Sequence, residues 1–289
     1  MSRRLVPMDT ITLGEVEITR VVERHGEFGP LRTFVPGVPD PAPSWLVPDH
    51  HDPATGGMIA AAQTWVLRSA GRTILVDTGV GNDRVRTNPV FAGWHTDFLE
   101  RLSAVVDPSD VNVVVNTHVH ADHVGWNTHD VDGEWAPTFP NATYLIHRAD
   151  HEHFKGTEVH DDSVAPVMDL VTLWENGFRI DDNLELEAAP GHTPGSAVLR
   201  LRSGSDRAVF VGDMLHSPYQ VTDPLCNSTF CLDQNQAQAT RLRVLGRAAD
   251  ERELVVPAHF GGHGAVEVAH DGSNFAITGW AAFAQLSAA

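Results

Sequence analysis

The order of hydrophobic and polar positions along the chain predicts short β-strands that alternate with a few helices. Strands are predicted at residues 11–22, 64–76, 111–116, 143–147, 178–186, 197–211 and 254–257. Turn residues inside the second and sixth of these segments predict that each folds back on itself as a hairpin. Helices are predicted at residues 97–106, 163–175, 235–251 and 278–286. In the third helix, Asp233 can act as the N-cap, with Gln236 three residues further on.

Three segments show neither the helical nor the strand-like spacing of hydrophobic residues, and they are rich in turn-forming residues and aromatic rings. They are residues 26–57, 125–140 and 216–232. Long irregular segments in a compact domain are commonly functional, so we expect them to cap a pocket. Trp45, Trp126 and Phe230 are the candidates for its walls. The alternative is that such rings only pin the loops to the core.

The charge balance is strongly acidic, because 38 Asp and Glu against 20 Lys and Arg give −18 with histidine neutral. A protein that grips the nucleic-acid backbone needs the opposite sign, so nucleic acid is not expected as a partner. No apolar run approaches the roughly 20 residues that cross a bilayer, and no signal-peptide core follows the first residues. We therefore expect a cytoplasmic protein with no membrane partner. Cys226 and Cys231 are too few for a disulfide framework and are expected to be buried free thiols.

Seventeen histidines make the placement of this residue type the next question. His118 and His120 directly follow strand 111–116, and Asp122 and His123 come on the turn after them. Side chains alternate along a strand, so the first two histidines point the same way as the chain leaves the sheet. Imidazole and carboxylate groups at this spacing are typical ligands of a first-row divalent metal.

Residues of the same chemistry follow other predicted strands. His192 lies in a turn bracketed by glycine and proline, Asp213 follows strand 197–211, and His259 follows strand 254–257. This recurrence predicts a site on one edge of a sheet sandwich. Histidines in polar loops are instead expected to be solvated, and they are His50, His51, His147, His151, His153, His160 and His270.

In this motif order the sequence resembles the metallo-β-lactamase-fold metallohydrolases over nearly its whole length. The ligands of that family fall on His118, His120, Asp122, His123, His192, Asp213 and His259. The resemblance implies one α/β domain over residues 1–289, a four-layered αββα sandwich of two similar halves. It also implies a two-metal site at one edge of the sandwich, between the sheets.

The resemblance further implies a role for each ligand. His118, His120 and His192 would hold one ion, Asp122, His123 and His259 the other, and Asp213 would bridge them. The cofactor would be two zinc ions, although iron, manganese or cobalt suit the same donors. Asp77 would orient the ligand loops without itself binding a metal. His263, four residues past His259, is a second candidate for that role.

Two cations close together lower the pKa of a bridging water and polarise the oxygen under attack, which predicts a bridging hydroxide as nucleophile. Asp122 can orient that hydroxide or pass its proton to the leaving group. His216 is proposed to hydrogen-bond the developing oxyanion or the leaving oxygen. An equally open interpretation is that His216 only orients a ligand or packs its loop.

Departures from the pattern narrow the choice of relatives. The best-known lactamases resemble this pattern but carry cysteine where Asp213 stands, and quorum-signal lactonases carry tyrosine where His216 stands. The methyl parathion hydrolase-like branch resembles the chain better there, so the lactonase and methyl parathion hydrolase-like group is the closest match. Its members imply a small, fairly apolar lactone, ester or phosphotriester as substrate. A homodimer stays open, because related hydrolases often dimerise.

Other functions are also left open by the sequence. They are a β-lactamase-like or thioesterase hydrolase, and a non-hydrolytic member of the fold that binds iron or another ligand. Members that lose catalysis usually lose ligands, whereas this chain keeps the full set. That observation favours hydrolysis.

Overall fold

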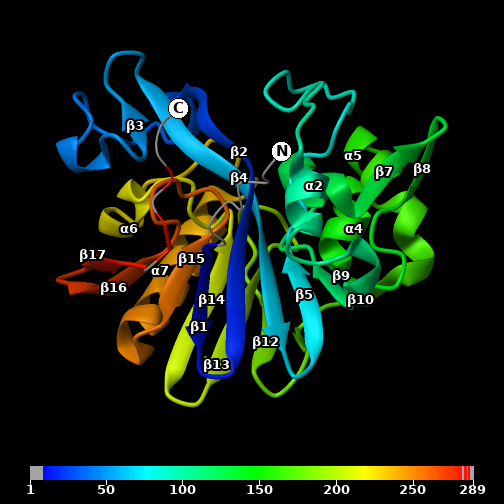
Figure 1. The fold of residues 1–289 in the computed structure, drawn as a ribbon. Helices are drawn as coiled ribbons and strands as arrows, with labels where there is room; N and C mark the ends of the chain where they lie inside the picture. The colour runs from blue at the N-terminus through cyan, green and yellow to red at the C-terminus, as the bar shows by residue number, and fades with distance from the viewer. Residues whose placement is uncertain (1–8, 282, 285, 287–289) are drawn as a thin grey trace, which may run out of the picture.

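The computed structural model describes residues 9–281, 283, 284 and 286, and it shows two β-sheets with helices on their outer faces (Figure 1). The first sheet has the order β1-β2-β4-β5-β6-β9-β10, with β3 paired to β4. Its strands are β1 (Asp9–Leu13), β2 (Val16–Pro30), β3 (His51–Asp52), β4 (Gly57–Ser69), β5 (Arg72–Val76), β6 (Val113–Val115), β9 (Thr143–His147) and β10 (Val171–Trp174).

The second sheet follows chain order from β11 to β17. Its strands are β11 (Gly177–Arg179), β12 (Leu184–Ala188), β13 (Ala197–Ser203), β14 (Asp206–Gly212), β15 (Leu254–Pro257), β16 (Val266–Asp271) and β17 (Asn274–Trp280). A separate hairpin consists of β7 (Thr128–Val131) and β8 (Glu134–Pro137).

Helices join and cover these strands. The α-helices are α1 (Leu31–Phe34), α2 (Phe98–Ser103), α3 (Ala121–Val124), α4 (Arg148–Phe154), α5 (Glu158–Ser163), α6 (Tyr219–Thr222) and α7 (Gln234–Glu251). Short 3₁₀ helices span Ser44–Leu46, Pro108–Asp110, Gly125–Asn127 and Ala165–Leu170. Among the described residues, no helix combines the length and apolarity that a membrane crossing requires.

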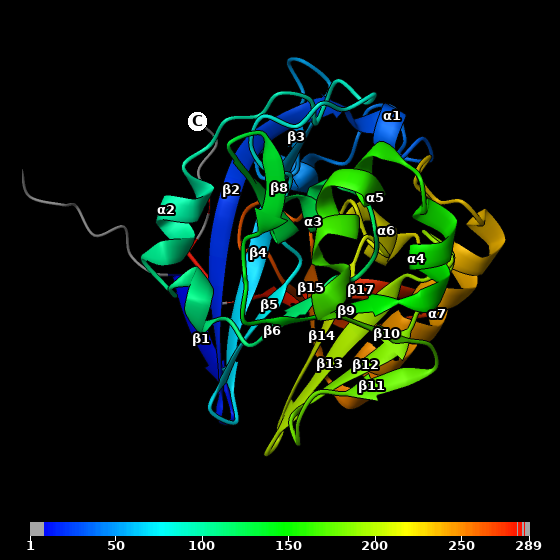
Figure 2. The same ribbon diagram turned by 90° about the vertical axis from the view of Figure 1, so that its right-hand side faces the viewer.

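Three hydrophobic clusters give the molecule its layers. The central cluster joins residues of both sheets, among them Trp65 and Phe210, and so lies between them. Val244 and Leu245 of α7 pack on the second sheet, and Phe98 of α2 packs on the first. Figure 2 shows α2 and α7 on opposite sides of the paired sheets. The α/β sandwich expected from the sequence is therefore confirmed.

Strand direction explains why chemically active residues gather at one edge. In the first sheet β5, β6 and β9 run parallel, so the residues after β5 and after β6 leave the sheet on the same side. In the second sheet β14 and β15 are parallel, and β12 has the same direction because β13 is antiparallel to both β12 and β14. Residues after β12, β14 and β15 thus share an edge as well.

Several predicted boundaries are wrong for local reasons. The single strand expected at 11–22 is a hairpin of β1 and β2, because Gly14 adopts a positive φ of 58° and turns the chain. The segment at 178–186 divides into β11 and β12. The helix expected at 163–175 is a 3₁₀ turn followed by β10, whose Val171, Thr172 and Trp174 suit a strand.

The C-terminal helix expected at 278–286 is also wrong where it can be compared, since β17 continues to Trp280. Part of that prediction lies outside the described residues. The three irregular segments contain short elements: the end of β2 with α1, the β7–β8 hairpin, and α6. Helix α7 is confirmed, and Asp233 caps it by accepting a hydrogen bond from the Gln236 backbone N–H at 2.9 Å.

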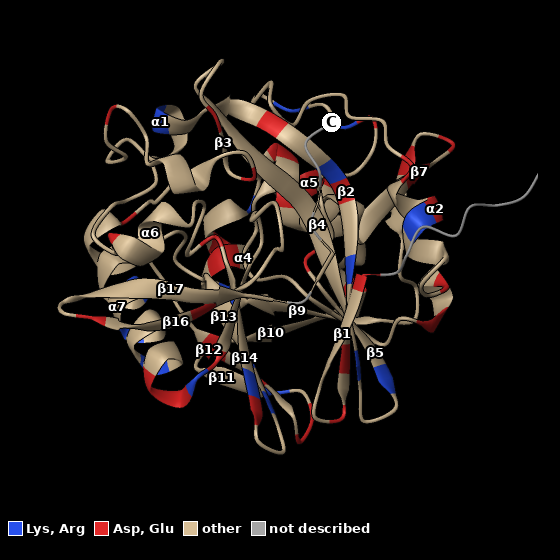
Figure 3. Cartoon of the chain, turned by 60° about the vertical axis from the view of Figure 1, so that its left-hand side comes forward, with Lys and Arg blue, Asp and Glu red and all other residues tan. Residues whose placement is uncertain are grey.

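Acidic residues lie on several elements, including the C-terminal end of α7 and the β7–β8 turn (Figure 3). The two cysteines, Cys226 and Cys231, are buried and free, as expected.

Candidate metal centre

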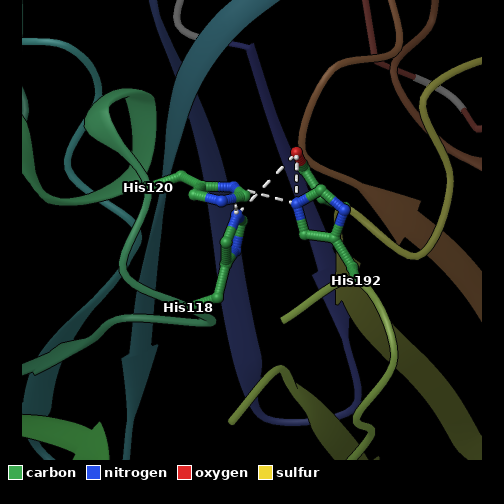
Figure 4. A group of neighbouring side chains, drawn as sticks. His118, His120 and His192 are labelled. Atoms are coloured by element: carbon green, nitrogen blue, oxygen red, sulfur yellow. Dashed lines mark hydrogen bonds and ion pairs between the residues drawn. The ribbon is translucent and has the colours of Figure 1, made fainter. Parts of the chain in front are cut away.

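One group of converging side chains consists of His118, His120 and His192, with a carboxylate oxygen of Asp213 beside them. Figure 4 shows the three rings turning their nitrogens toward one another. Nδ1 of His120 lies 2.9 Å from Nε2 of His118 and 2.9 Å from Nε2 of His192. Oδ2 of Asp213 lies 3.8 and 3.4 Å from the same two Nε2 atoms. We refer to His118, His120 and His192 as the three-histidine group.

A second group consists of Asp122, His123 and His259. Nε2 of His123 and Nε2 of His259 are 3.2 Å apart, and Oδ2 of Asp122 lies 3.8 and 3.3 Å from them. Oδ1 of Asp213 approaches the same two nitrogens at 3.2 and 3.0 Å. Asp213 therefore directs one oxygen toward each group. We refer to Asp122, His123 and His259 as the carboxylate-side group.

Short helices and strand ends place these ligands. β6 ends at Val115, and the chain passes His118 and His120 before α3 carries the next two ligands. On the facing sheet, His192 follows β12, Asp213 follows β14 and His259 follows β15. The sequence pattern placed all seven candidates at strand ends, and the fold brings all seven together.

The two groups differ in charge. Burial lowers the pKa of His118 and of His192 well below the usual value, and it lowers the pKa of His120 to about 4. These rings are therefore neutral near pH 7, which leaves a lone pair on one nitrogen of each ring. Neutral imidazole is the form that ligates metals.

In the carboxylate-side group, burial alone would lower the histidine pKa values. The carboxylates around His123, with Asp213 first, raise the pKa of His123 well above its usual value. Asp213 and Asp122 likewise raise the pKa of His259 to about 10. Burial would raise the pKa of Asp213, yet the positive charge of His259 and His123 holds it well below its usual range. In the metal-free protein this group is a set of buried ion pairs.

The ring nitrogens that face away from the cluster have their own partners. Nδ1 of His123 lies 2.8 Å from Oδ2 of Asp77, and Nδ1 of His259 lies 2.9 Å from the carbonyl oxygen of Ala61. Both partners are acceptors, so each Nδ1 carries a proton and directs Nε2 into the cluster. Asp77 also accepts the Thr117 N–H and hydroxyl at 2.7 and 2.8 Å, which fixes the start of the ligand loop.

The donor set fits divalent cations. Ligands about 2.1 Å from a tetrahedral zinc ion lie roughly 3.4 Å from one another. The ligand-atom pairs described above are 2.9–3.8 Å apart, which spans that spacing, and all ligand atoms of each group lie within 4.8 Å of one another. Among the described residues, no hydrogen-bond donor is aligned on the buried Oδ1 of Asp213. A carboxylate oxygen without such a donor, among five imidazoles, suits a pair of cations.

A mostly apolar cavity of about 240 Å³ opens above the cluster. Its floor includes His120, Asp122, His192, Asp213 and His259. Its walls are mainly apolar, and they include Phe28, Phe34, Met58, Val90, Phe91, Val159 and Phe230. A larger and more polar groove of about 580 Å³ lies beside it, but its described lining contains none of the seven candidate ligands. Of the two cavities, the smaller one is lined by candidate ligands.

His216 lies at the cavity, with Nε2 3.2 Å from Oδ2 of Asp213. Its ring lies over that of Phe230 at 6.3 Å, and its backbone N–H donates to Oε1 of Gln220 at 2.7 Å. Among the described residues, the buried Nδ1 of His216 has no hydrogen-bond partner. The ring is therefore held in place while one nitrogen remains available.

The structure corrects two predicted wall residues. Trp126 is buried in the core against Phe98, with ring centroids 5.6 Å apart, and its Nε1 donates to Glu23 at 2.8 Å. Trp45 is 45% exposed on a 3₁₀ turn and does not line the cavity. Of the three, only Phe230 lines it. Aromatic residues in loops pin core and surface as readily as they form a pocket.

His263 belongs to neither ligand group, and its Nδ1 lies 2.7 Å from the carbonyl oxygen of Phe283. Five of the seven histidines expected to be solvated are instead buried: His50, His51, His147, His151 and His160. His153 and His270 are exposed as expected. His147 packs on Trp174 of β10, and His151 of α4 packs on His160 of α5, contacts that local polarity could not reveal.

Glu23 is a supporting residue that the sequence interpretation missed. Its buried carboxylate accepts hydrogen bonds from the Val80 N–H at 2.7 Å and from Trp126, and so fixes the segment after Asp77. Burial raises the pKa of Glu23 to about 7. A glutamate directly after the apolar pair Val21 and Val22 of a predicted strand was the available signal.

Comparisons with known proteins identify the family of the chain. Residues 60–259 match the family model of the metallo-beta-lactamase superfamily. An N-acyl homoserine lactonase from Bacillus sp. is 23% identical over 167 residues, which cover 52% of this chain and 62% of the lactonase. A beta-lactamase-like protein 2 homolog from Caenorhabditis elegans is 27% identical over 159 residues, covering 54% of this chain and 45% of that protein. The chain thus aligns with less than two thirds of either relative.

Solved structures share the fold at low identity. A probable metal-dependent hydrolase from Staphylococcus aureus has a TM-score of 0.79 and 18% identity, covering 93% of this chain and 98% of its own. A dizinc quorum-quenching lactonase, in complex with a product, has a TM-score of 0.77 and 20% identity, covering 95% of this chain and 97% of its own.

Proposed function

Since the chain belongs to the metallo-beta-lactamase superfamily, we propose that it is a metal-dependent hydrolase of a small, mostly apolar lactone, ester or phosphotriester. One observation carries the proposal: two groups of candidate ligands meet at Asp213, and five of the seven ligands line a mostly apolar cavity. The lactonase relatives support a small-molecule substrate.

The three-histidine group with Oδ2 of Asp213 would hold one ion, and the carboxylate-side group with Oδ1 would hold the other. When bound, two divalent cations lower the pKa of water and polarise the substrate oxygen. We propose zinc, because five imidazoles with two carboxylates suit it. The chain supplies two negative charges through Asp122 and Asp213, which offset part of the charge of two dications.

Three side chains near the floor would act on the substrate. Asp122, which lines the cavity, would orient the attacking water and carry its proton toward the leaving group. His216 would donate a hydrogen bond to the developing negative charge, because its ring is fixed beside Asp213. Phe230 and the other apolar walls would exclude bulk water and accept the hydrocarbon part of the substrate.

A substrate panel run together with a metal measurement tests the proposal. Protein purified without added metal is expected to contain close to two equivalents of divalent ions and to hydrolyse at least one lactone, aryl ester or phosphotriester. Less than one equivalent and no hydrolysis after zinc addition would overturn it. Iron in place of zinc, with hydrolysis retained, would correct the metal alone.

The role of His216 has a separate test. His216→Phe is expected to lower kcat by about 10²-fold while metal content stays near two equivalents. His153→Phe, on the exposed face of α4, is the control and should leave kcat unchanged. An unchanged kcat in His216→Phe would assign this residue to loop packing.

A further inference from the structure

The imidazoles of the candidate centre can be compared by the contacts they make on the side away from the cluster. On that side, Nδ1 of His123 lies 2.8 Å from the Asp77 carboxylate, and Nδ1 of His259 lies 2.9 Å from the Ala61 carbonyl oxygen. Nδ1 of His118 lies 3.2 Å from the Thr117 hydroxyl. A ring that binds a metal through one nitrogen is oriented by the partner of its other nitrogen, so these contacts matter for affinity.

His192 is held differently. Its Nδ1 lies 3.9 Å from Sγ of Cys231, and both side chains are buried. Two backbone hydrogen bonds dock the same segments, from Leu232 N–H to the His192 carbonyl and from Asp233 N–H to the Gly191 carbonyl, each 3.0 Å. The approach is close, because a Cβ added to Gly191 would lie 2.3 Å from the Ala237 nitrogen at the start of α7.

We propose that Cys231 is a positioning residue for His192, whose Nδ1–H donates to the cysteine sulfur. This contact selects the tautomer in which Nε2 keeps its lone pair, 2.9 Å from Nδ1 of His120. The rigid docking of residues 231–233 on the His192 turn transmits the position of α7 to the ligand. The inference rests on the proposed metal centre and concerns the three-histidine group alone.

The chain supplies a matched control in its other cysteine. Cys226 is also buried and free, at 5% exposure against 7% for Cys231. It packs in a hydrophobic cluster with Phe34 and Val38, and a Cβ added to Gly37 would lie 2.5 Å from its sulfur. Truncating either side chain removes the same atoms, whereas the contact with His192 involves Cys231.

The test measures zinc affinity on the full chain. Wild type, Cys231→Ala and Cys226→Ala are stripped of metal and titrated with zinc against a chromophoric chelator, and the Tm of each metal-free protein is recorded. Wild type and Cys226→Ala are expected to bind two zinc ions with the same pair of Kd values. Cys231→Ala is expected to bind one ion unchanged and the other about tenfold more weakly, the low end of the effect of removing a ligand's supporting partner.

The readout separates positioning from packing. A lower Tm is expected in both alanine variants, so Tm alone does not support the proposal. Wild-type Kd values in Cys231→Ala would overturn it, and so would an equal loss of affinity in Cys226→Ala. If Cys231→Ala does not fold, Cys231→Val, which fills the space of the thiol without a sulfur acceptor, takes its place under the same criteria. Wild type that binds fewer than two zinc ions would instead overturn the proposed metal centre.

Discussion

The three-histidine group and the carboxylate-side group are built from similar side chains but are supported in different ways. His123 and His259 have a carboxylate and a carbonyl behind them at 2.8 and 2.9 Å. His118 and His192 have a hydroxyl at 3.2 Å and a thiol at 3.9 Å. The carboxylate-side group is thus oriented by strong acceptors, and the three-histidine group by weak ones.

The two groups also differ in charge. The three-histidine rings are neutral because burial lowers their pKa values, whereas His123 and His259 are held charged by Asp213 and its neighbours. Ligands that are already ordered lose less conformational freedom when they bind an ion. The difference teaches that one set of ligand residues can form two metal-binding groups of unequal affinity. Metal affinity depends on the hydrogen-bond partners that orient each ligand as well as on the ligands themselves.

The largest expected effect comes from removing the residue that the groups share. Asp213→Ala deletes an oxygen from both groups and leaves buried histidines without their counter-charge. We expect metal content to fall below one equivalent and kcat/KM to drop by more than about 10³-fold, beyond the roughly 10- to 100-fold of supporting residues. Elemental analysis and hydrolysis assays measure both. Asp223→Ala, at the end of α6, is the control, and retention of two ions by Asp213→Ala would contradict a bridging role.

Asp77→Asn weakens the support of the carboxylate-side group. Asparagine tolerates the positive φ of 58° at this position but lacks the charge that faces His123. Affinity for the tighter zinc ion is expected to fall by up to about 100-fold, measured by chelator competition. Asp83→Asn, an exposed aspartate with a φ of 57°, should change nothing. Equal weakening of both ions would show that the groups are not independent.

His50→Phe tests the layer behind the carboxylate-side group, where His50 packs on Phe260, the residue after His259. Burial lowers the pKa of His50 from 6.5 to about 4, so between these values the unfolded chain binds a proton that the folded chain does not. This contribution to stability is present above pH 6.5 and is lost as pH falls toward 4. Between pH 7.5 and 5 the free energy of unfolding of the metal-free wild type should fall by about 2 kcal/mol more than that of the variant.

Urea unfolding at the two pH values measures the His50 effect. His153→Phe is the control, because the ring of His153 is exposed in the folded chain as well. An identical pH dependence in wild type and His50→Phe would contradict the buried neutral ring.

The smallest expected effect needs no substitution. If the two groups differ as their supports suggest, a chelator removes one zinc ion from the wild type at about tenfold lower concentration than the other. The ion retained longer should be the one that Asp77→Asn weakens. Loss of both ions in a single step would remove the contrast between the groups.

Much of the candidate centre could be predicted from the sequence, because its ligands are local features of strand ends. His118, His120, Asp122 and His123 share six positions, and they come shortly after the apolar strand β6. Pocket walls were less predictable: Phe230 lines the cavity, whereas Trp126 is core. An aromatic ring in a loop has no local signal for the side to which it turns.

By itself, the sequence determined the family, the α/β sandwich and the candidate ligands, since these depend on periodicity and on residue types at strand ends. Tertiary structure alone decided how Asp213 faces both groups and what stands behind each imidazole. Ala61, which contacts His259, is 198 positions away from it in the sequence, and Cys231 is 39 positions away from His192. Such contacts form only when the two sheets and α7 close around the edge, and no local pattern encodes a partner so distant along the chain.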